Sequence, residues 1–435
     1  MVKKTLIIFL TFFYLKAITS QTPYYKKYIE ILNKENIDLK VQMIRKQKSD
    51  LNIEQKKKMI SPFQLELQYE TGTKNYPTNL LQLEEASSQK IKHYIIGLSK
   101  AIDVLSKQKT KYEIAQWEKE LEDNYSYLMK KQILSEFRLS YFRLIYLQRI
   151  KEHLSKHINQ FERLSSKYHK NYFDKKLGNY TRMALQIGIS KLKSEYTEAE
   201  SEIQKELSYI RQLLNFDNYL IYVDKIEDIS QLFPTELNEK ELQKDYEESP
   251  IYKAELIKLK IKQKEKELAK KEEFHSFEVF FQYGERETGN YKNLTFDPIN
   301  PEKETTYTLG LRIPIPYGTE SSMNKFLIQK EEEIQVLQIE KTKVFLKNQI
   351  QYLTQIYKNN YQLFQQNIQT LYQSEPYLEM LDDSLLNRRI SFFEYWGEHE
   401  KFHDLLQLTL KTFEVIVESL NLLELYTGKN LFQDI

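Results

Sequence analysis

Alternating apolar and polar residues mark four short segments of the chain. The first runs from Phe63 to Glu70, and similar patterns lie at 93–99, 277–283 and 307–313; within 277–283, Phe280 breaks the alternation. Side chains on a β-strand point to opposite faces in turn, so each segment predicts a strand with one apolar and one polar face. The polar face is expected to hold Gln64, Glu66, Gln68, Glu278, Gln282 and Arg312.

The rest of the chain is dominated by a helical pattern, with apolar residues at a spacing of three to four. It predicts helices at 24–58, 103–170, 177–214, 239–273, 321–386 and 392–426. The segment 103–170 contains neither Pro nor Gly, and as one helix it would be roughly 100 Å long. A helix far longer than the usual mean of about 11–12 residues must pack sideways against similar helices or form a coiled coil.

These elements occur twice in the same order. Ser61-Pro-Phe-Gln-Leu-Glu-Leu-Gln-Tyr-Glu70 is similar to Ser276-Phe-Glu-Val-Phe-Phe-Gln-Tyr-Gly284, and Ile96–Ile102 is similar to Leu309–Ile315 at nearly the same offset. An internal repeat of this kind decides how the whole chain is divided. We therefore predict a first repeat at 21–215, an irregular inter-repeat segment at 216–238, a second repeat at 239–428 and a tail at 429–435.

The N-terminus has the pattern of a signal peptide. Lys3 and Lys4 precede an apolar run from Leu6 to Leu15, and the small residues Ala17 and Ser20 follow it. The run is shorter than the roughly 20 residues of a membrane span, so we predict cleavage after residue 20 and export of the chain. A retained anchor is the alternative.

Composition narrows the classes of function. The 64 Lys and Arg nearly balance the 62 Asp and Glu, and a formal net charge of +2 does not indicate a nucleic-acid partner. The sequence contains no Cys, which excludes disulfides, thiolate metal sites and a Cys nucleophile.

The four strands have features of membrane strands. Each strand is expected to have about the 9–11 residues that a tilted membrane strand requires, and Tyr or Phe residues lie toward strand ends. Long polar loops are expected at 71–90 and 284–305. An ordinary half-buried sheet has the same alternation. Open strand edges are not stable in lipid, so spanning strands must be pooled between chains, and three chains would supply twelve.

Three pieces of the sequence resemble the TolC-type outer-membrane efflux family. The clearest is Thr308-Leu-Gly-Leu-Arg-Ile-Pro-Ile-Pro-Tyr-Gly318, which is similar to the family's strand-to-helix junction, with Pro314 and Pro316 ending strand pairing. The ending Leu425-Tyr-Thr-Gly428 is similar to the close of the family's final helix. The resemblance implies a mostly α, α+β fold: two structural repeats whose four strands contribute to a trimeric twelve-stranded barrel, and long helices that form a periplasmic tunnel.

The third piece is the pair of helical hairpin tips, where the family pattern is roughly Gly-x-x-Ser/Thr-x-x-Asp/Glu. The first copy, Gly178-Asn-Tyr-Thr181-Arg-Met-Ala184, lacks the acid, and the second, Arg388-Arg-Ile-Ser391-Phe-Phe-Glu394, lacks the Gly. The resemblance implies that Glu394 lines a gate at the tip, where an acidic ring favours cations. Arg388 and Arg389 are candidates for ion pairs that hold the gate shut. Gly178, Thr181 and Ser391 are candidates for contact with an adaptor. For Glu394, Arg388 and Arg389, the alternative is a solvated side chain without a role in a gate.

A competing motif lies in the last helix. His399-Glu-Lys-Phe-His403 matches the HExxH pattern of zinc metalloproteases, in which two His bind the metal and the Glu is the general base. The equivalent helix of the first repeat has no such motif, and three fixed positions arise easily by chance in a Glu- and Lys-rich helix. We interpret His153 and His157, also four residues apart, as solvated or interhelical side chains rather than metal ligands.

The sequence therefore predicts a homotrimeric, outer-membrane channel-tunnel that extends into the periplasm. It would conduct substrate passively from an inner-membrane pump and a periplasmic adaptor to the outside, without enzymatic activity, cofactor or metal. A periplasmic coiled-coil scaffold is the main alternative, and a zinc metalloprotease built on His399, Glu400 and His403 is a remote one.

Overall fold

A computed structural model gives the fold of the chain. It describes residues 24–58, 63–75, 88–103, 105–170, 175–216, 220–224, 232–272, 277–291, 299–313, 320–387 and 389–432. The predicted signal peptide at 1–20, Arg388, Pro314 and Pro316 lie outside these residues.

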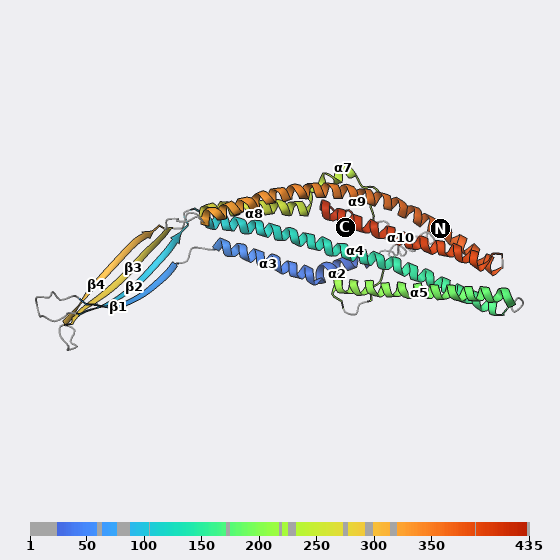
Figure 1. The fold of residues 1–435 in the computed structure, drawn as a ribbon, viewed down its shortest axis with the longest axis horizontal. Helices are drawn as coiled ribbons and strands as arrows, with labels where there is room; N and C mark the ends of the chain where they lie inside the picture. The colour runs from blue at the N-terminus through green and yellow to red at the C-terminus, as the bar shows by residue number, and fades with distance from the viewer. Residues whose placement is uncertain are drawn as a thin grey trace, which may run out of the picture. The chain divides into compact units, whose positions relative to one another are not determined.

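Long helices and four strands make up the described residues (Figure 1). In chain order they are α2 (Tyr24–Glu35), α3 (Ile37–Lys58), β1 (Phe63–Asn75), β2 (Ser88–Ile102), α4 (Lys107–Lys170), α5 (Lys175–Leu214), α7 (Glu239–Leu242), the 3-10 helix η1 (Asp245–Glu248), α8 (Pro250–Glu272), β3 (Phe277–Tyr291), β4 (Ile299–Arg312), α9 (Glu320–Leu386) and α10 (Phe392–Thr427). The helix–strand–strand–helix order thus occurs twice, and the mostly helical α+β fold class predicted from the sequence is confirmed. None of the described helices has the length and apolarity that a membrane span requires.

The chain divides into two compact units. One contains Gln47–Leu121 and Ile257–Leu337, including all four strands, and we call it the sheet unit. The other contains Met1–Lys46, Glu122–Leu256 and Gln338–Ile435, and we call it the helical unit. Both long helices, α4 and α9, contribute residues to each unit.

The sheet is an antiparallel meander in the order β1-β2-β3-β4 (Figure 1). Its strands have 13, 15, 15 and 14 residues, longer than the 9–11 expected. The difference lies at the hairpin ends, where β1 pairs with β2 as far as Asn75 and Ser88. Backbone pairing there continues into polar sequence that was expected to be loop, because ladder hydrogen bonds do not require an apolar face.

Two predicted helices are interrupted. The segment expected as one helix from Tyr24 breaks at Asn36, whose side-chain amide donates to the carbonyl of Leu213 at 2.8 Å and whose side-chain oxygen accepts from the Leu39 N–H at 3.1 Å. An Asn that bonds to backbone in this way competes with the helix ladder. The segment expected from Glu239 to Glu273 is likewise divided into α7, η1 and α8, with Pro250 at the start of α8.

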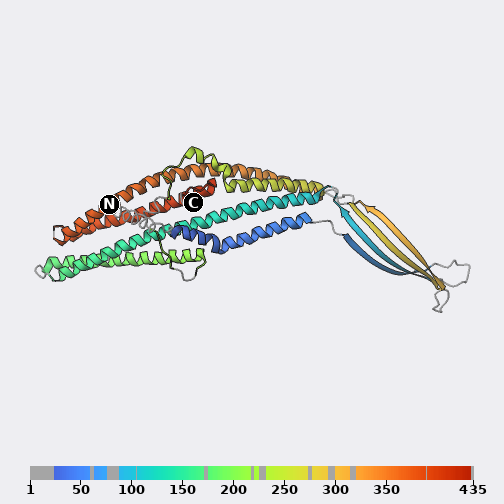
Figure 2. The ribbon, with the colours of Figure 1, turned by 180° about the vertical axis from the view of Figure 1, so that it is seen from behind.

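The helical unit contains two antiparallel hairpins, α4 with α5 and α9 with α10 (Figures 1 and 2). Their core is rich in aromatic rings. Tyr25 of α2 stacks on Phe142 of α4 with ring centroids 5.2 Å apart, and Phe142 meets Phe413 of α10 at 5.9 Å. Aromatic side chains bury a large apolar area each, so this cluster holds helices of both halves of the chain together.

The inter-repeat segment takes part in that core. Phe233 lies 5.4 Å from Phe413, centroid to centroid. The carboxylate of Asp224 accepts hydrogen bonds from the backbone N–H groups of Tyr24 and Tyr25 at 2.9 and 2.8 Å, and from the Tyr141 hydroxyl at 2.8 Å. Asp224 thereby satisfies the first N–H groups of α2, which have no partner within the helix.

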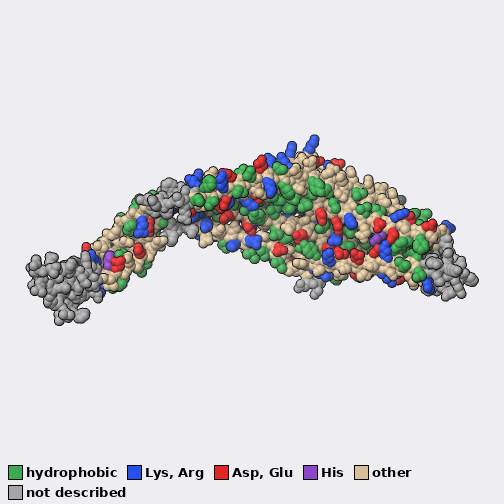
Figure 3. Space-filling view, viewed as in Figure 1, with side chains coloured by type: hydrophobic (Ala, Val, Ile, Leu, Met, Phe, Trp, Pro, Cys, Tyr) green, Lys and Arg blue, Asp and Glu red, His purple; other side chains and the backbone are tan. Residues whose placement is uncertain are grey.

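Ion pairs join the helices of the sheet unit. Lys264 of α8 pairs with Glu113 of α4 at 2.7 Å, and Lys266 of α8 pairs with Glu332 of α9 at 2.7 Å. On the face drawn in Figure 3, acidic and basic side chains are interspersed over the helices. This mixture agrees with the nearly balanced charge of the sequence.

Candidate channel surfaces

One face of the sheet carries the polar residues predicted from the sequence. Paired residues of neighbouring strands point to the same face, and the register aligns Glu66 with Gly97, Gly97 with Gln282, and Gln282 with Thr308. The next rows place Gln64, Gln68, Glu278 and Arg312 on this same face. All six residues assigned to the polar face therefore share it, although their predicted role in lining a channel stays a prediction.

Hydrogen bonds connect this polar face across strands. The Gln282 amide donates to the Glu66 carboxylate at 3.4 Å, across Gly97 of the intervening strand. A Cβ at Gly97 would lie 3.2 Å from the Gln282 side chain and 3.3 Å from that of Glu66. Arg312 donates to Glu278 at 3.0 Å. The glycine thus leaves room for a contact between β1 and β3.

Phe280 is the one apolar residue that breaks the alternation in β3. Its ring lies over Gly310 of β4, where a Cβ would collide with the ring, and the Arg312 guanidinium lies 5.5 Å from the ring centroid. Phe280 therefore lies on the polar face, between a glycine and a cation. The sequence alone showed that Phe280 departs from the alternation of its strand, but its contact with Gly310 depends on the strand register.

The opposite face of the sheet is apolar and exposed. Leu65, Leu98, Phe281 and Leu309 form one row across the four strands. Their exposed fractions are 66%, 44%, 46% and 78%. Other exposed apolar residues of this face are Phe63, Leu67, Tyr69, Tyr94, Ile96, Tyr307 and Leu311. Monomers in water rarely expose so continuous an apolar surface, so this face must meet a nonaqueous environment or another molecule.

At the end of the α9–α10 hairpin, Ser391 is the N-cap of α10. Its hydroxyl accepts from the Glu394 N–H at 3.2 Å, while the Glu394 carboxylate accepts from the Ser391 N–H at 2.8 Å. This is a capping box, which satisfies two backbone donors at once. The bond from Ser391 lowers the pKa of Glu394, which is exposed. The acid proposed for a gate is therefore a carboxylate at neutral pH, and it also helps to begin the helix.

The other predicted tip residues are less clearly placed. Gly178 and Thr181 lie inside α5, which begins at Lys175, so neither is in a turn or at the N-cap of the helix. Helix-forming residues at 175–177 extend the helix toward the turn. Arg389 is exposed, and no ion pair to it is found among the described residues. The roles predicted for these residues remain untested.

The HExxH residues do not form the arrangement of a zinc protease. Glu400, the expected base, forms an ion pair with Lys191 of α5, and this contact lowers the pKa of Glu400. His403 points its Nε2 toward Glu195 at 3.5 Å, whereas His399 lies beside His153 and His157 of α4. The interhelical position of His153 and His157 agrees with one of the two expectations, but His157 is only 3% exposed and is not solvated.

An apolar stripe on α9 was not identified from the sequence. Met323, Phe326, Leu327, Ile334 and Leu337 are 57–67% exposed, at helical spacing on the part of α9 in the sheet unit. Apolar residues at this spacing usually mark the face that a helix buries. Only the structure reveals that the described residues of this chain leave it uncovered.

Comparison with known proteins identifies the fold. No protein-family model and no curated protein matches the sequence. Three solved outer-membrane channels are similar in structure. CmeC of Campylobacter jejuni is 14% identical, with 94% of this chain and 86% of that chain covered and a TM-score of 0.68. MtrE of Neisseria gonorrhoeae, in its open state, is 13% identical, with 93% of this chain and 88% of that chain covered and a TM-score of 0.66. VceC of Vibrio cholerae is 12% identical, with 94% of this chain and 96% of that chain covered and a TM-score of 0.65.

These similarities extend over nearly the whole chain, including the sheet and the helical hairpins. At such low identity they establish the fold alone. The chain has the fold of the TolC-type outer-membrane channels, as the sequence resemblance predicted.

Proposed function

We propose that this chain is an outer-membrane channel-tunnel that passively conducts substrate out of the cell, with its helices extending into the periplasm. The observation that carries the proposal is the two-faced sheet. One face is polar and hydrogen-bonded across strands, and the other is apolar and exposed. Lipid on the apolar face and water on the polar face would satisfy both. No bond is made or broken in this function, so it requires neither catalytic residue nor cofactor.

The sheet also supports assembly from several copies. Within the described residues, β1 and β4 each have one unpaired edge. Unpaired backbone groups are unfavourable in lipid, so the edges of neighbouring chains must pair. A homotrimer would provide twelve strands in a closed barrel, and the exposed stripe of α9 would pack against the next protomer.

Conductance in a planar lipid bilayer tests the channel directly. Purified, folded protein is expected to insert and to give discrete current steps. If it does not insert although its circular dichroism is that of the folded helical protein, the barrel is wrong and a periplasmic coiled-coil scaffold becomes the better account.

The gate role of Glu394 requires a separate comparison, because this residue also belongs to the capping box. Glu394→Gln removes the charge but retains a side chain that completes the box, whereas Glu394→Ala removes both. If three carboxylates set ion selectivity, both variants lose preference for cations. Loss of preference in the Ala variant alone would assign the effect to helix capping. Unchanged currents in both would leave the channel without a gate at Glu394.

The oligomeric state is tested by native mass spectrometry in detergent. The wild type is expected to be a trimer, and a charge within the α9 stripe, as in Ile334→Glu, is expected to lower the trimer fraction. A monomeric wild type that nevertheless conducts would contradict the pooling of strands.

We further propose that the channel belongs to a tripartite export system, with an inner-membrane pump and a periplasmic adaptor that docks on the hairpin ends. Gly178, Thr181 and Ser391 are the candidate contacts, and Arg388 and Arg389 are candidates for holding the closed state. A photo-crosslinking residue at Thr181 is expected to capture an adaptor in living cells. The same probe at Ser374, farther from the hairpin end in α9, serves as the control. Equal capture at both positions would contradict the docking site.

A further inference from the structure

Three histidines meet in the helical unit at a place that the channel function does not use. His153 and His157 lie one turn apart on α4, and His399 reaches them from α10. One ring nitrogen of each lies within 4.8 Å of a ring nitrogen of each of the others. His157 is 3% exposed and His399 is 1% exposed, so the group is largely removed from solvent.

The ring nitrogens of this group are not satisfied by the protein. The buried atoms Nε2 of His153, Nδ1 of His157 and Nε2 of His399 have no hydrogen-bond partner. Buried polar atoms are nearly always paired, so three unpaired nitrogens at one place require an explanation. A bound ion would provide one shared partner for all three.

Packing alone does not provide that explanation. The ring centroid of His399 lies 4.1 Å from that of His157 and 5.7 Å from that of Phe161, and His153 lies 4.8 Å from Phe402. These contacts account for the position of the rings. They leave the nitrogens without partners, and Phe or Leu at the same positions would fill the space without that cost.

We propose that His153, His157 and His399 bind a divalent first-row transition-metal ion of the Zn²⁺ type, which links α4 to α10. Imidazole nitrogen is a preferred ligand of Zn²⁺, Ni²⁺ and Cu²⁺, whereas Mg²⁺ and Ca²⁺ require oxygen ligands. With Zn–N bonds of about 2.0–2.1 Å, tetrahedral ligand nitrogens lie about 3.4 Å apart. The three nitrogens lie within 4.8 Å of one another, so binding an ion requires the rings to rotate closer together.

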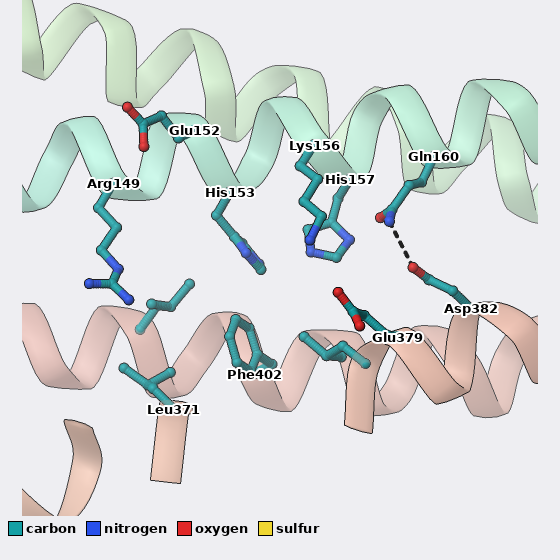
Figure 4. A pocket seen from close by; sticks show the side chains of 12 residues that line it. Arg149, Glu152, His153, Lys156, His157, Gln160, Leu371, Glu379, Asp382 and Phe402 are labelled. Carbon is teal, nitrogen blue, oxygen red and sulfur yellow. Dashed lines mark hydrogen bonds between the residues drawn. The ribbon is translucent and has the colours of Figure 1, made fainter. Parts of the chain in front are cut away.

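The surroundings suit such an ion. A cavity of about 370 Å³ adjoins His153 and His157, and Glu379 and Asp382 of α9 line it (Figure 4). The cavity gives an ion a path from solvent, and it leaves the fourth position of the ion to a water molecule.

This site differs from the one that the HExxH motif predicts. That motif pairs His399 with His403 and uses Glu400 as a base. The proposed site instead takes His399 together with two histidines of the other half of the chain, and Glu400 remains in its ion pair with Lys191. An ion held by three helical side chains without a free base has a structural role.

The test uses the full chain without a histidine tag, stripped with chelator and dialysed against Zn²⁺. Elemental analysis is expected to find one Zn²⁺ per chain, and Zn²⁺ is expected to raise the melting temperature reversibly. Co²⁺ in its place is expected to give the absorption bands of tetrahedral nitrogen coordination. Mg²⁺ is expected to change neither measurement.

Two substitutions of His by Phe distinguish the proposed three-histidine site from the HExxH pair. His157→Phe retains an aromatic ring and is expected to weaken Zn²⁺ binding by more than about 100-fold, beyond the loss typical of residues that only support a ligand. His403→Phe is the matched control and is expected to bind Zn²⁺ like the wild type. Loss of binding in the control but not in His157→Phe would restore the HExxH pair. Folded wild-type protein that binds no Zn²⁺ would overturn the site whatever the variants do.

Discussion

Arg138 of α4 and Glu424 of α10 form a buried ion pair, with Nη1 2.7 Å from Oε2 and exposed fractions of 1% and 2%. Both ends have further partners. The Arg138 Nε donates to the Tyr25 hydroxyl at 2.9 Å, and the other carboxylate oxygen of Glu424 accepts from the backbone N–H groups of Leu431 and Phe432 at 2.6 and 3.2 Å. The pair thereby joins the first half of the chain to the last helix and to the segment after it.

Removing one partner of this pair is expected to be costly. Glu424→Leu should lower the free energy of unfolding by about 3–5 kcal/mol, because the Arg138 charge stays buried without its counterion. Chemical denaturation followed by circular dichroism measures the change. Arg138→Met combined with Glu424→Leu should recover much of it. Glu162→Ala, which breaks the exposed pair with Lys193, is the control and should cost at most about 1 kcal/mol. Equal losses of stability in Glu424→Leu and Glu162→Ala would contradict the role of burial.

Substitution by Ala is expected to change stability in opposite directions at two glycines, one inside α10 and one at its C-terminal end. Gly428, the C-cap of α10, has a φ of 73°, and a Cβ there would lie 2.9 Å from the Glu248 carbonyl oxygen. Gly428→Ala should therefore destabilise the protein by about 1–2 kcal/mol. Gly397, inside α10, has open space where a Cβ would lie, so Gly397→Ala should stabilise the protein by about 0.8–1 kcal/mol. Melting temperatures that shift in the same direction would show that backbone conformation does not decide these positions.

Adjacent positions of β1 test the two faces of the sheet. Leu67 lies on the apolar face and Gln68 on the polar one. If the apolar face meets lipid, Leu67→Lys should oppose insertion by up to about 2–4 kcal/mol. Gln68→Lys should insert normally and change only the ion preference of the current. The measurement is the folded fraction in lipid vesicles, read from the gel mobility of unheated samples. Equal insertion of both variants would count against a lipid-facing surface.

The capping box predicts a local effect on stability. Ser391→Ala removes the side-chain acceptor of the Glu394 N–H and should cost about 1 kcal/mol. Ser374, inside α9, donates to the Thr370 carbonyl of its own helix, so Ser374→Ala should be neutral or slightly stabilising. Hydrogen exchange of the first turn of α10 locates the change, and an effect spread over the whole helical unit would point to another cause.

The same box has a predictable pH dependence. The Ser391 N–H holds the pKa of Glu394 below its usual value of 4.5 in the folded chain. Above pH 4.5 the carboxylate is charged in both states and its contribution is complete. As the pH falls through the lower, folded pKa, the contribution is lost. The difference in melting temperature between the wild type and Glu394→Gln should therefore shrink as the pH falls below 4.5, with no change from pH 6 to 8.

Local pattern determined the elements of this protein. Alternation in Phe63–Glu70 placed Leu67 and Gln68 on opposite faces because the strand period of two leaves no other arrangement. Helical spacing over 321–386 predicted a helix that begins one residue away from its observed start at Glu320. The repeated order of elements, together with the family resemblance carried by the Pro-containing junction after Arg312, predicted the fold class. It could not show how far each strand continues, because hairpin pairing beyond the apolar face leaves no pattern in the sequence.

Contacts between distant segments were decided only by the tertiary structure. The break at Asn36 depends on the carbonyl of Leu213, and the start of α2 depends on Asp224. His399 belongs with His153 and His157 because two long helices bring those turns side by side, whereas its sequence neighbours spell a different motif. Short-range spacing fixes which face of an element a side chain occupies. Only the packing of elements decides what that face meets, and both the histidine group and the buried pair of Arg138 with Glu424 are products of that packing.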